Sequence, residues 1–191
     1  MLDKSIPYYN VIMRLRSGIA ASSFSLPSGY TYAWFEPGNE KKWAEIETSV
    51  GEFTTVEQAH RYFCEHYLRY VDEVKRRVLF ILNPDGEEVG TITSWWNVTG
   101  ERRDPSIHWF AVKKEYQGIG LGKALVSKGL RQLKQLEGDG DIYLHTQTWS
   151  YKAIELYIQA GFEILENESF GGYQNDYEKA MPFIEMKLRK G

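Results

Sequence analysis

Between Ile107 and Leu125 the chain reads Ile107-His-Trp-Phe-Ala-Val-Lys-Lys-Glu-Tyr-Gln-Gly-Ile-Gly-Leu-Gly-Lys-Ala-Leu125. The first six residues predict a strand, and the residues from Leu121 onward predict a helix after a short loop. Three glycines, at positions 118, 120 and 122, surround the start of this helix and let the backbone approach a ligand closely. Free N–H groups and the positive end of the helix dipole lie at the same place, so the turn predicts a phosphate or pyrophosphate site.

Two common phosphate-binding motifs do not match this turn. A P-loop requires Gly-x-x-x-x-Gly-Lys-Ser/Thr, but position 117 is Gln and Gly122-Lys123 is followed by Ala124. A dinucleotide fingerprint requires Gly-x-Gly-x-x-Gly, but the last position is lysine when counted from Gly118 and leucine when counted from Gly120. The ligand is therefore neither the nucleoside triphosphate of a P-loop protein nor a dinucleotide held by that fingerprint.

The motif that does match is Gln-x-x-Gly-x-Gly, present here as Gln117-Gly-Ile-Gly-Leu-Gly122. A second match follows about 30 residues later as Thr148-Trp-Ser-Tyr-Lys-Ala-Ile-Glu-Leu-Tyr-Ile-Gln-Ala-Gly-Phe162, with a capping Ser, Ala three residues later, Leu-Tyr, and Gly-Phe before a strand. Together the two segments resemble the acyl-CoA-binding motifs of the GCN5-related N-acetyltransferase (GNAT) superfamily.

The resemblance implies an α/β (α+β) fold, a single GNAT-like domain with a mixed central sheet splayed in a V and helices on both faces. The domain is expected to span residues 30–191, and residues 1–29 are interpreted as an extra N-terminal arm and linker. The V would open where the strands Ile107–Val112 and Ile142–Thr146 separate.

Hydrophobic periodicity predicts the element order β, α, α, β, β, β, α, β, α, β, β. Ser5–Arg16 is expected to form an edge strand or an arm. Thr54-Thr55-Val56-Glu57-Gln58 contains two overlapping capping boxes, Thr54 with Glu57 and Thr55 with Gln58, at the start of a helix. Ser150 is expected to cap a short helix, and Phe183–Leu188 is expected to close the chain as a strand.

The resemblance further implies acetyl-CoA as co-substrate, and no metal is expected. The pantetheine arm would pair with the backbone near the end of the strand, where an N–H group could polarise the thioester carbonyl. The glycine turn would bind the pyrophosphate, and Ser150 stands where many relatives have Asn. The expected acetyl-CoA-binding residues are Phe110, Ala111, Val112, Gln117, Gly118, Ile119, Gly120, Leu121, Gly122, Lys123 and Ser150.

Two residues are candidates for proton transfer. At its motif position, Tyr157 is implied to be the general acid that protonates the leaving CoA thiolate, because a phenol of pKa ~10 can deliver a proton to a thiolate of pKa ~8.5. His108 resembles a histidine of the arylalkylamine acetyltransferases, and Ser106 occupies the position where other family members carry a Glu base. His108 is either the base, directly or through a water, or a packing residue. As a base in a cleft it is expected to titrate near the usual pKa of ~6.5 unless its environment shifts that pKa.

The expected function is acetyl-CoA-dependent N-acetyltransfer to a primary amine by direct attack in a ternary complex. Cys64 lies in a helical pattern far from both motifs, so an acyl-cysteine intermediate is not expected. Two alternatives stay open: a non-catalytic acyl-CoA-binding or sensing module, and an acetyltransferase of peptide or protein N-termini. The sequence does not identify the acceptor. Four acidic residues either attract a cationic amine or belong to a solvated face, namely Glu47, Glu52, Asp176 and Glu178.

Composition restricts the remaining classes of protein. The 191 residues carry a net charge of −3, which argues against a general nucleic-acid or anionic-membrane binder. Cys64 is the single cysteine, which rules out an intrachain disulfide or a Cys-rich zinc module. The longest apolar run, Val78–Leu82, is far shorter than the ~18 residues of a spanning helix. A cytoplasmic location is expected, and a homodimer is kept open.

Overall fold

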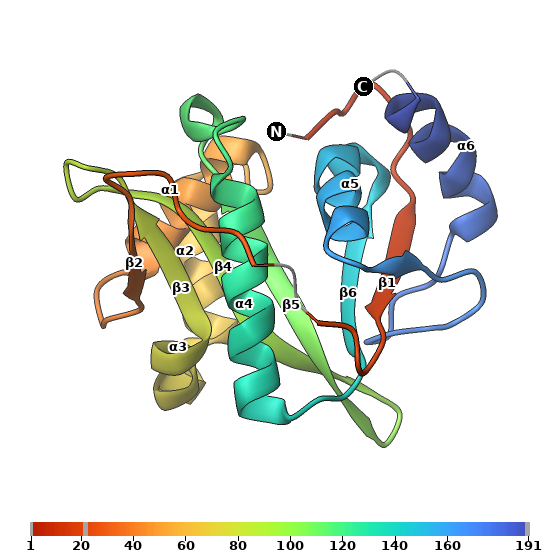
Figure 1. The fold of residues 1–191 in the computed structure, drawn as a ribbon, viewed down its shortest axis with the longest axis horizontal. Coiled ribbons are helices and arrows are strands. Elements are labelled where there is room, and N and C mark those ends of the chain that lie inside the picture. The colour runs from red at the N-terminus through yellow and green to blue at the C-terminus, as the bar shows by residue number, and fades with distance from the viewer. Residues whose placement is uncertain (1, 21–22, 190–191) are drawn as a thin grey trace. The chain divides into compact units, whose positions relative to one another are not determined.

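The computed structural model describes residues 2–20 and 23–189 (Figure 1). The strands are β1 (Asn10–Leu15), β2 (Thr31–Trp34), β3 (Val78–Leu82), β4 (Glu88–Thr99), β5 (Arg102–Val112), β6 (Ile142–Gln147) and β7 (Glu163–Ile164). The helices are α1 (Glu40–Val50), α2 (Val56–His66), α3 (Val71–Arg77), α4 (Leu121–Glu137), α5 (Tyr151–Gln159) and α6 (Tyr177–Leu188), with the short 3-10 helices η1 (Leu68–Tyr70), η2 (Lys114–Tyr116) and η3 (Thr148–Ser150).

The strands hydrogen-bond in the order β2-β3-β4-β5-β6-β1-β7. The β5–β6 pair is parallel, whereas β1 pairs antiparallel with β6 and with β7. The predicted α/β fold with a mixed sheet is therefore confirmed. The described residues form two compact units. The first contains residues 23–94 and 109–132, and the second contains residues 2–20, 95–108 and 133–189.

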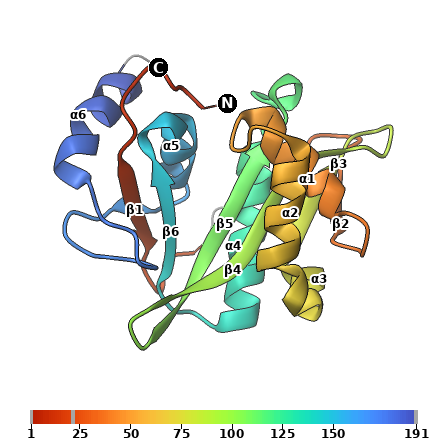
Figure 2. The same cartoon turned by 180° about the vertical axis from the view of Figure 1, so that it is seen from behind.

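In the first unit, helices cover both faces of the strands. Helices α1 and α2 lie on one face of β3 and β4, and α4 lies on the other, as the two opposite views show (Figures 1 and 2). Close approach of α4 depends on Gly129, since a Cβ there would lie 2.9 Å from Ile92 Cδ1. The Ser94 hydroxyl donates a hydrogen bond of 3.0 Å to the Gly129 carbonyl across the same contact. The missing side chain thus lets the helix that follows the glycine turn pack directly on the sheet.

In the second unit, β1 is an internal strand. It pairs with β6 from Asn10↔Gln147 to Leu15↔Ile142 and with β7 through Met13↔Ile164. The expectation of an edge strand or an arm for Ser5–Arg16 is wrong in this respect, because residues of β1 are buried on both faces of the sheet. One of these faces carries a core cluster of Ile12, Tyr143, Leu165 and Phe170. The domain boundary at residue 29 stays a prediction.

The closing strand expected at Phe183–Leu188 is wrong, because these residues belong to α6. Ala180 and Ile184 are its buried residues, and their spacing of four places them on one helical face. Pro182 lies inside the helix, where it lacks the N–H group of a regular helical hydrogen bond. The helical spacing of the buried residues, rather than alternation, therefore governs this segment.

The two capping boxes predicted at the start of α2 are resolved in favour of the second. Thr55 is the N-cap, and its hydroxyl accepts a hydrogen bond of 3.2 Å from the Gln58 N–H group. The Gln58 side chain accepts in return from the Thr54 N–H group at 3.3 Å. Thr54 therefore contributes its backbone to the cap, and Thr55 contributes its side chain.

This difference yields a stability prediction. Thr55→Ala should lower the free energy of unfolding by about 1 kcal/mol, because the Gln58 N–H group loses its acceptor. Thr54→Ala, the matched control, should change it much less, since its N–H group is retained. Urea unfolding of the two variants measures the difference, and equal losses would contradict the assignment of Thr55 as the cap.

Candidate active site

The glycine turn lies in the first unit between the end of β5 and the start of α4. After η2, the Gln117 side chain turns back and donates a hydrogen bond of 2.7 Å from Nε2 to the Val112 carbonyl. Gly118 and Gly120 have φ angles of 84° and 95°, in the region that glycine enters without strain. The Ala124 N–H group donates to the Gly120 carbonyl at 3.1 Å, so the regular hydrogen bonds of α4 begin here.

The turn provides the features that an acetyl-CoA pyrophosphate requires. The N–H groups of the first helical turn have no carbonyl one turn earlier in the helix to bond, and they lie at the positive end of the helix dipole. A Cβ on Gly118 or Gly120 would meet no atom within 4 Å, so the space beside the backbone is open. Ile119 between them is 48% exposed. The residues present therefore fit the phosphate-binding role that the sequence predicts for Gln117–Lys123.

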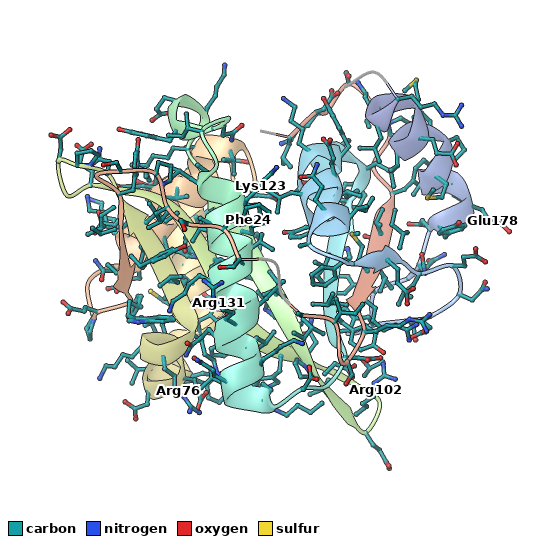
Figure 3. The ribbon with its side chains drawn as sticks, in the orientation of Figure 1. Phe24, Arg76, Arg102, Lys123, Arg131 and Glu178 are labelled. Atoms are coloured by element: carbon teal, nitrogen blue, oxygen red, sulfur yellow. The ribbon has the colours of Figure 1, made fainter. Side chains whose placement is uncertain are left out.

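Lys123 lies beside residues of the segment that leads into β2. Its ammonium group lies 5.6 Å from the centre of the Phe24 ring, and the two side chains are neighbours in Figure 3. The Phe24 N–H group donates to the Ser127 hydroxyl at 3.4 Å, and Arg131 donates to the same hydroxyl at 2.9 Å. Phe24 therefore lies close to the start of α4, a position that no sequence pattern predicts.

The strand segment expected to hold the thioester is Phe110–Val112. Ala111 and Val112 are buried, as expected for side chains of a sheet. The Val112 carbonyl already accepts the Gln117 hydrogen bond, so the role predicted for this segment falls to its other backbone groups. Trp109, just before it, has a φ angle of 41°, which is rare for a bulky residue. The regular strand conformation is therefore interrupted next to the predicted thioester position.

Tyr157 lies on α5 in the second unit and is 6% exposed. Its carbonyl accepts hydrogen bonds from the Ala160 and Phe162 N–H groups, at 3.1 and 3.0 Å, which close the end of the helix. Its ring lies 5.8 Å from the Phe162 ring. Tyr157 thus contacts the turn into β7, which contains the Gly-Phe pair at the end of the second motif.

Ser150 is the N-cap residue of α5, but its side chain does not cap the helix. The side chain of Gln147 performs a related role for the preceding η3 and accepts a hydrogen bond of 3.0 Å from the Ser150 N–H group. The predicted capping by Ser150 is therefore wrong in its side-chain detail. Its contact with acetyl-CoA stays a prediction.

His108 and His145 follow the paired residues Ile107 and Leu144 of the parallel strands β5 and β6. The His108 Nε2 atom is buried, and burial together with the neighbouring His145 lowers the pKa of His108 to about 3. The environment of His108 therefore shifts its pKa away from the usual value of ~6.5. His108 is neutral throughout the physiological pH range.

No sequence pattern predicts the surroundings of His145. Burial lowers the pKa of this histidine to about 4. Its Nε2 donates a hydrogen bond of 2.8 Å to Asn10 Oδ1, and its ring stacks on Tyr173 at 3.6 Å between centroids. Because Asn10 and Tyr173 are distant in sequence, only the fold brings them to this histidine.

The four acidic candidates have different environments. Glu47 is fully buried, whereas Glu178 is exposed on α6 (Figure 3). Asp176 accepts a hydrogen bond of 3.1 Å from the Asn10 N–H group and lies 3.8 Å from the Lys179 ammonium group. Asp176 thus has a structural role, and Glu47 is the acidic residue whose environment is most unusual.

Two further properties concern metals and membranes. Among residues 2–20 and 23–189, no three His, Cys, Asp or Glu side chains lie together as a metal site would require. Each helix in the same residues is too short or too polar to cross a membrane.

A mixed sheet with a Gln-x-x-Gly-x-Gly turn between a strand and a helix is the arrangement that the resemblance to the GNAT superfamily implies. Residues 31–162 match the sequence model of the acetyltransferase (GNAT) family. The chain belongs to this family.

Curated relatives and solved structures extend this result. The chain is 26% identical over 110 residues to an N-alpha-acetyltransferase of Sulfurisphaera tokodaii, covering 53% of this chain and 63% of the relative. It is 33% identical over 91 residues to a mycothiol acetyltransferase of Streptomyces coelicolor, covering 47% of this chain and 28% of the relative. The chain thus spans less than two thirds of either relative.

Among solved structures, a GCN5-related N-acetyltransferase from Sphaerobacter thermophilus aligns with a TM-score of 0.63 at 20% identity. The alignment covers 84% of this chain and 50% of that one. At this identity, the likeness supports the fold alone.

The glycine turn yields a binding prediction. Gly120→Glu should weaken acetyl-CoA binding about 100-fold or more, because it adds bulk and negative charge where the pyrophosphate approaches the helix N–H groups. Gly138→Glu is the matched control, because Gly138 also has a positive φ (85°) and open space around its Cβ position, at the other end of α4. Calorimetric titration of both folded variants tests this, and equal affinities would contradict the phosphate site.

The two buried histidines yield a pH prediction. In the unfolded chain both histidines take up protons below a pKa of ~6.5. In the folded protein His108 and His145 stay neutral until the pH falls to their pKa values of about 3 and 4. Their contribution to stability is complete above pH ~6.5. It decreases as pH falls through the window down to those values, by about 1.4 kcal/mol per pH unit for each proton.

His108→Gln should reduce this slope between pH 6 and pH 4.5, as measured by urea unfolding. His66→Gln, a change at an exposed position on α2, should leave the slope intact. An unchanged slope in His108→Gln would mean that His108 protonates freely in the folded protein.

Proposed function

We propose that the protein is an acetyl-CoA-dependent N-acetyltransferase that moves an acetyl group to a primary amine by direct attack in a ternary complex. The observation that carries the proposal is the glycine turn at the start of α4, with positive φ at Gly118 and Gly120 and open space beside both, in a chain of the GNAT family. The test is calorimetric binding of acetyl-CoA, followed by an assay of CoA release over a panel of amines.

In the proposed reaction, the lone pair of the amine attacks the thioester carbonyl carbon, so that a C–N bond forms and the C–S bond then breaks. The turn Gln117–Lys123 holds the pyrophosphate, and Ser150 contributes a further contact. A backbone N–H group of Phe110–Val112 stabilises the negative charge that develops on the carbonyl oxygen. Tyr157 donates its phenolic proton to the departing thiolate, which leaves as the CoA thiol.

The attacking amine must also lose a proton, since an amine of pKa ~10 is mostly an ammonium ion at pH 7. His108 is kept neutral by burial and can accept a proton directly or through a water. A conjugate acid with a pKa of about 3 makes it a weak base. We therefore expect His108 to relay a proton rather than hold it, and to produce no inflection of the pH–rate profile near 6.5.

A second candidate function is acetylation of peptide or protein N-termini. It is favoured by the match to the Sulfurisphaera tokodaii N-alpha-acetyltransferase. The CoA-release panel should therefore contain peptides with free N-termini beside small amines. Tight acetyl-CoA binding without CoA release in the presence of any acceptor would favour the alternative of a non-catalytic acyl-CoA-binding module. A homodimer and a cytoplasmic location stay predictions from the sequence.

The proposed acid yields a kinetic prediction. Tyr157→Phe should bind acetyl-CoA like the wild type but lower kcat about 10²–10⁴-fold, because the thiolate loses its proton donor. Tyr151→Phe, at the first position of the same helix, is the control and should retain kcat. Steady-state kinetics at saturating substrates measure both. A kcat for Tyr157→Phe within about twofold of the wild type would leave Tyr157 a packing residue.

A further inference from the structure

β2 is an edge strand of the first unit, and part of its backbone points outward. Among the described residues it pairs only with β3, in an antiparallel arrangement. The Phe35 N–H group, just after β2, donates to the Val78 carbonyl at 3.0 Å and continues the same register. In an antiparallel ladder only every second residue bonds to a given neighbour. The N–H and C=O groups of Tyr32 and Trp34 therefore point away from β3.

The side chains of β2 leave this edge accessible. Trp34 is 37% exposed, Thr31 is exposed, and Tyr32 and Ala33 are half-buried. By contrast, the neighbouring β3 is almost completely buried. A strand edge with unpaired N–H and C=O groups can pair with a further strand, and this is a common way for proteins to bind extended peptides.

Two cations of α4 lie beside the same edge. Tyr32 and Trp34 point to one face of the sheet, and the Tyr32 hydroxyl donates to the Ala124 carbonyl of α4 at 3.0 Å. The Lys128 ammonium group lies 6.0 Å from the centre of the Trp34 ring. Burial raises the pKa of Tyr32, and the nearby Arg131 guanidinium on α4 partly offsets this rise (Figure 3). The accessible edge is thus flanked by positive charge on its α4 face.

This positive charge is not neutralised within the described part of the chain. Lys128 and Arg131 form no ion pair with a described carboxylate, and Arg131 instead donates to the Ser127 hydroxyl at 2.9 Å. The chain as a whole has a net charge of −3, so the positive charge is a local property of α4. Residues 121–136 of this helix contain cations and no acid, namely Lys123, Lys128, Arg131 and Lys134.

We propose that the outer edge of β2, with Lys128 and Arg131, binds an extended acidic segment of another protein, which adds a strand to the sheet. The main chain of the segment bonds to Tyr32 and Trp34. Its acidic side chains occupy every second position, so that they face the two cations. The inference is independent of the proposed acetyl transfer and adds a docking surface to it.

Two other occupants fit the edge less well. In a second copy paired edge to edge about a twofold axis, Lys128 and Arg131 of both chains would approach one another, and like charges on adjacent strands are destabilising. A nucleic acid would neutralise the cations through its phosphates, but it would not continue the strand ladder at Tyr32 and Trp34. An acidic peptide strand satisfies both the backbone edge and the cations.

The first experiment compares two peptides that differ in charge. Fluorescein-labelled Glu-Val-Glu-Val-Glu-Val-Glu carries all its carboxylates on one face when it is extended, and Gln-Val-Gln-Val-Gln-Val-Gln is its uncharged match. Fluorescence anisotropy at pH 7 and physiological salt measures their binding to the full chain. We expect a Kd of about 10–100 μM for the glutamate peptide and at least about tenfold weaker binding of the glutamine peptide.

The second experiment tests the added strand. Two forms of the glutamate peptide are N-methylated, one at the glutamate amides and the other at the valine amides, so that their charge is unchanged. Because only every second N–H group of an added strand faces β2, one form should lose at least about tenfold in affinity and the other should not. Equal affinities of the two forms would contradict strand addition.

The third experiment tests the cations. Lys128→Glu and Arg131→Glu should each weaken binding of the glutamate peptide at least about tenfold, because each places a like charge beside its carboxylates. Lys41→Glu is the matched control. It changes an exposed lysine of α1, which covers the opposite face of the sheet from α4 (Figures 1 and 2), and should retain the affinity. Urea unfolding verifies that the variants are folded.

Four results would overturn the inference. If the glutamate peptide does not bind the wild type, Lys128 serves only to protect a short edge from aggregation. Equal loss of affinity in Lys41→Glu would mean that the peptide responds to net charge. Equally tight binding of a thymidine oligonucleotide would indicate a surface for any polyanion. A dimer in sedimentation velocity that the peptide dissociates would assign the edge to a second copy. The peptide comparisons need no variant, so a folding defect cannot hide the answer.

Discussion

The Gln117 side chain bonds to the Val112 carbonyl at 2.7 Å, and the geometry of the proposed donor site depends on this contact. It ties the end of β5 to the turn before α4, so that strand end and helix start keep one orientation. The Lys113 N–H group donates to the Val89 carbonyl at 2.8 Å, which fixes the same strand end to β4. The proposed thioester and pyrophosphate positions are the two ends of this short segment. A constraint on the segment therefore fixes their separation.

Burial shifts the pKa values of three ionisable groups toward their neutral forms. His108 and His145 in the second unit have lowered pKa values, and Glu47 in the first has a raised one, with burial the largest cause in each. Burial therefore favours the neutral form of each group, at a cost to folding. The cost is unequal, because His145 has a hydrogen bond and a stacked ring, whereas Glu47 has no partner in the described residues.

Local patterns in the sequence predict most helices and strands, but they do not always distinguish the helical spacing of apolar residues from the alternation of a strand. The apolar run Val78–Leu82, followed by the turn sequence Asn-Pro-Asp-Gly, predicts a strand, and its bounds are those of β3. In Phe183–Leu188 the apolar residues partly alternate, a pattern that favours a strand. The buried pair Ala180 and Ile184 identifies a helix only when the surface that α6 covers is known. The internal position of β1 likewise depends on β6 and β7, more than 120 residues away.

The sequence by itself determined the family, the glycine turn and the candidate residues Tyr157 and His108, because these depend on residue types at fixed spacings along one short segment each. Tertiary structure decided the chemical state of those residues and of their neighbours. Burial removes the expected titration of His108, and the approach of α1, α2 and β5 gathers four aromatic rings beside a buried acid. Desolvation and contacts between distant segments appear only after folding. A sequence read residue by residue therefore identifies candidate groups but not their pKa values or partners.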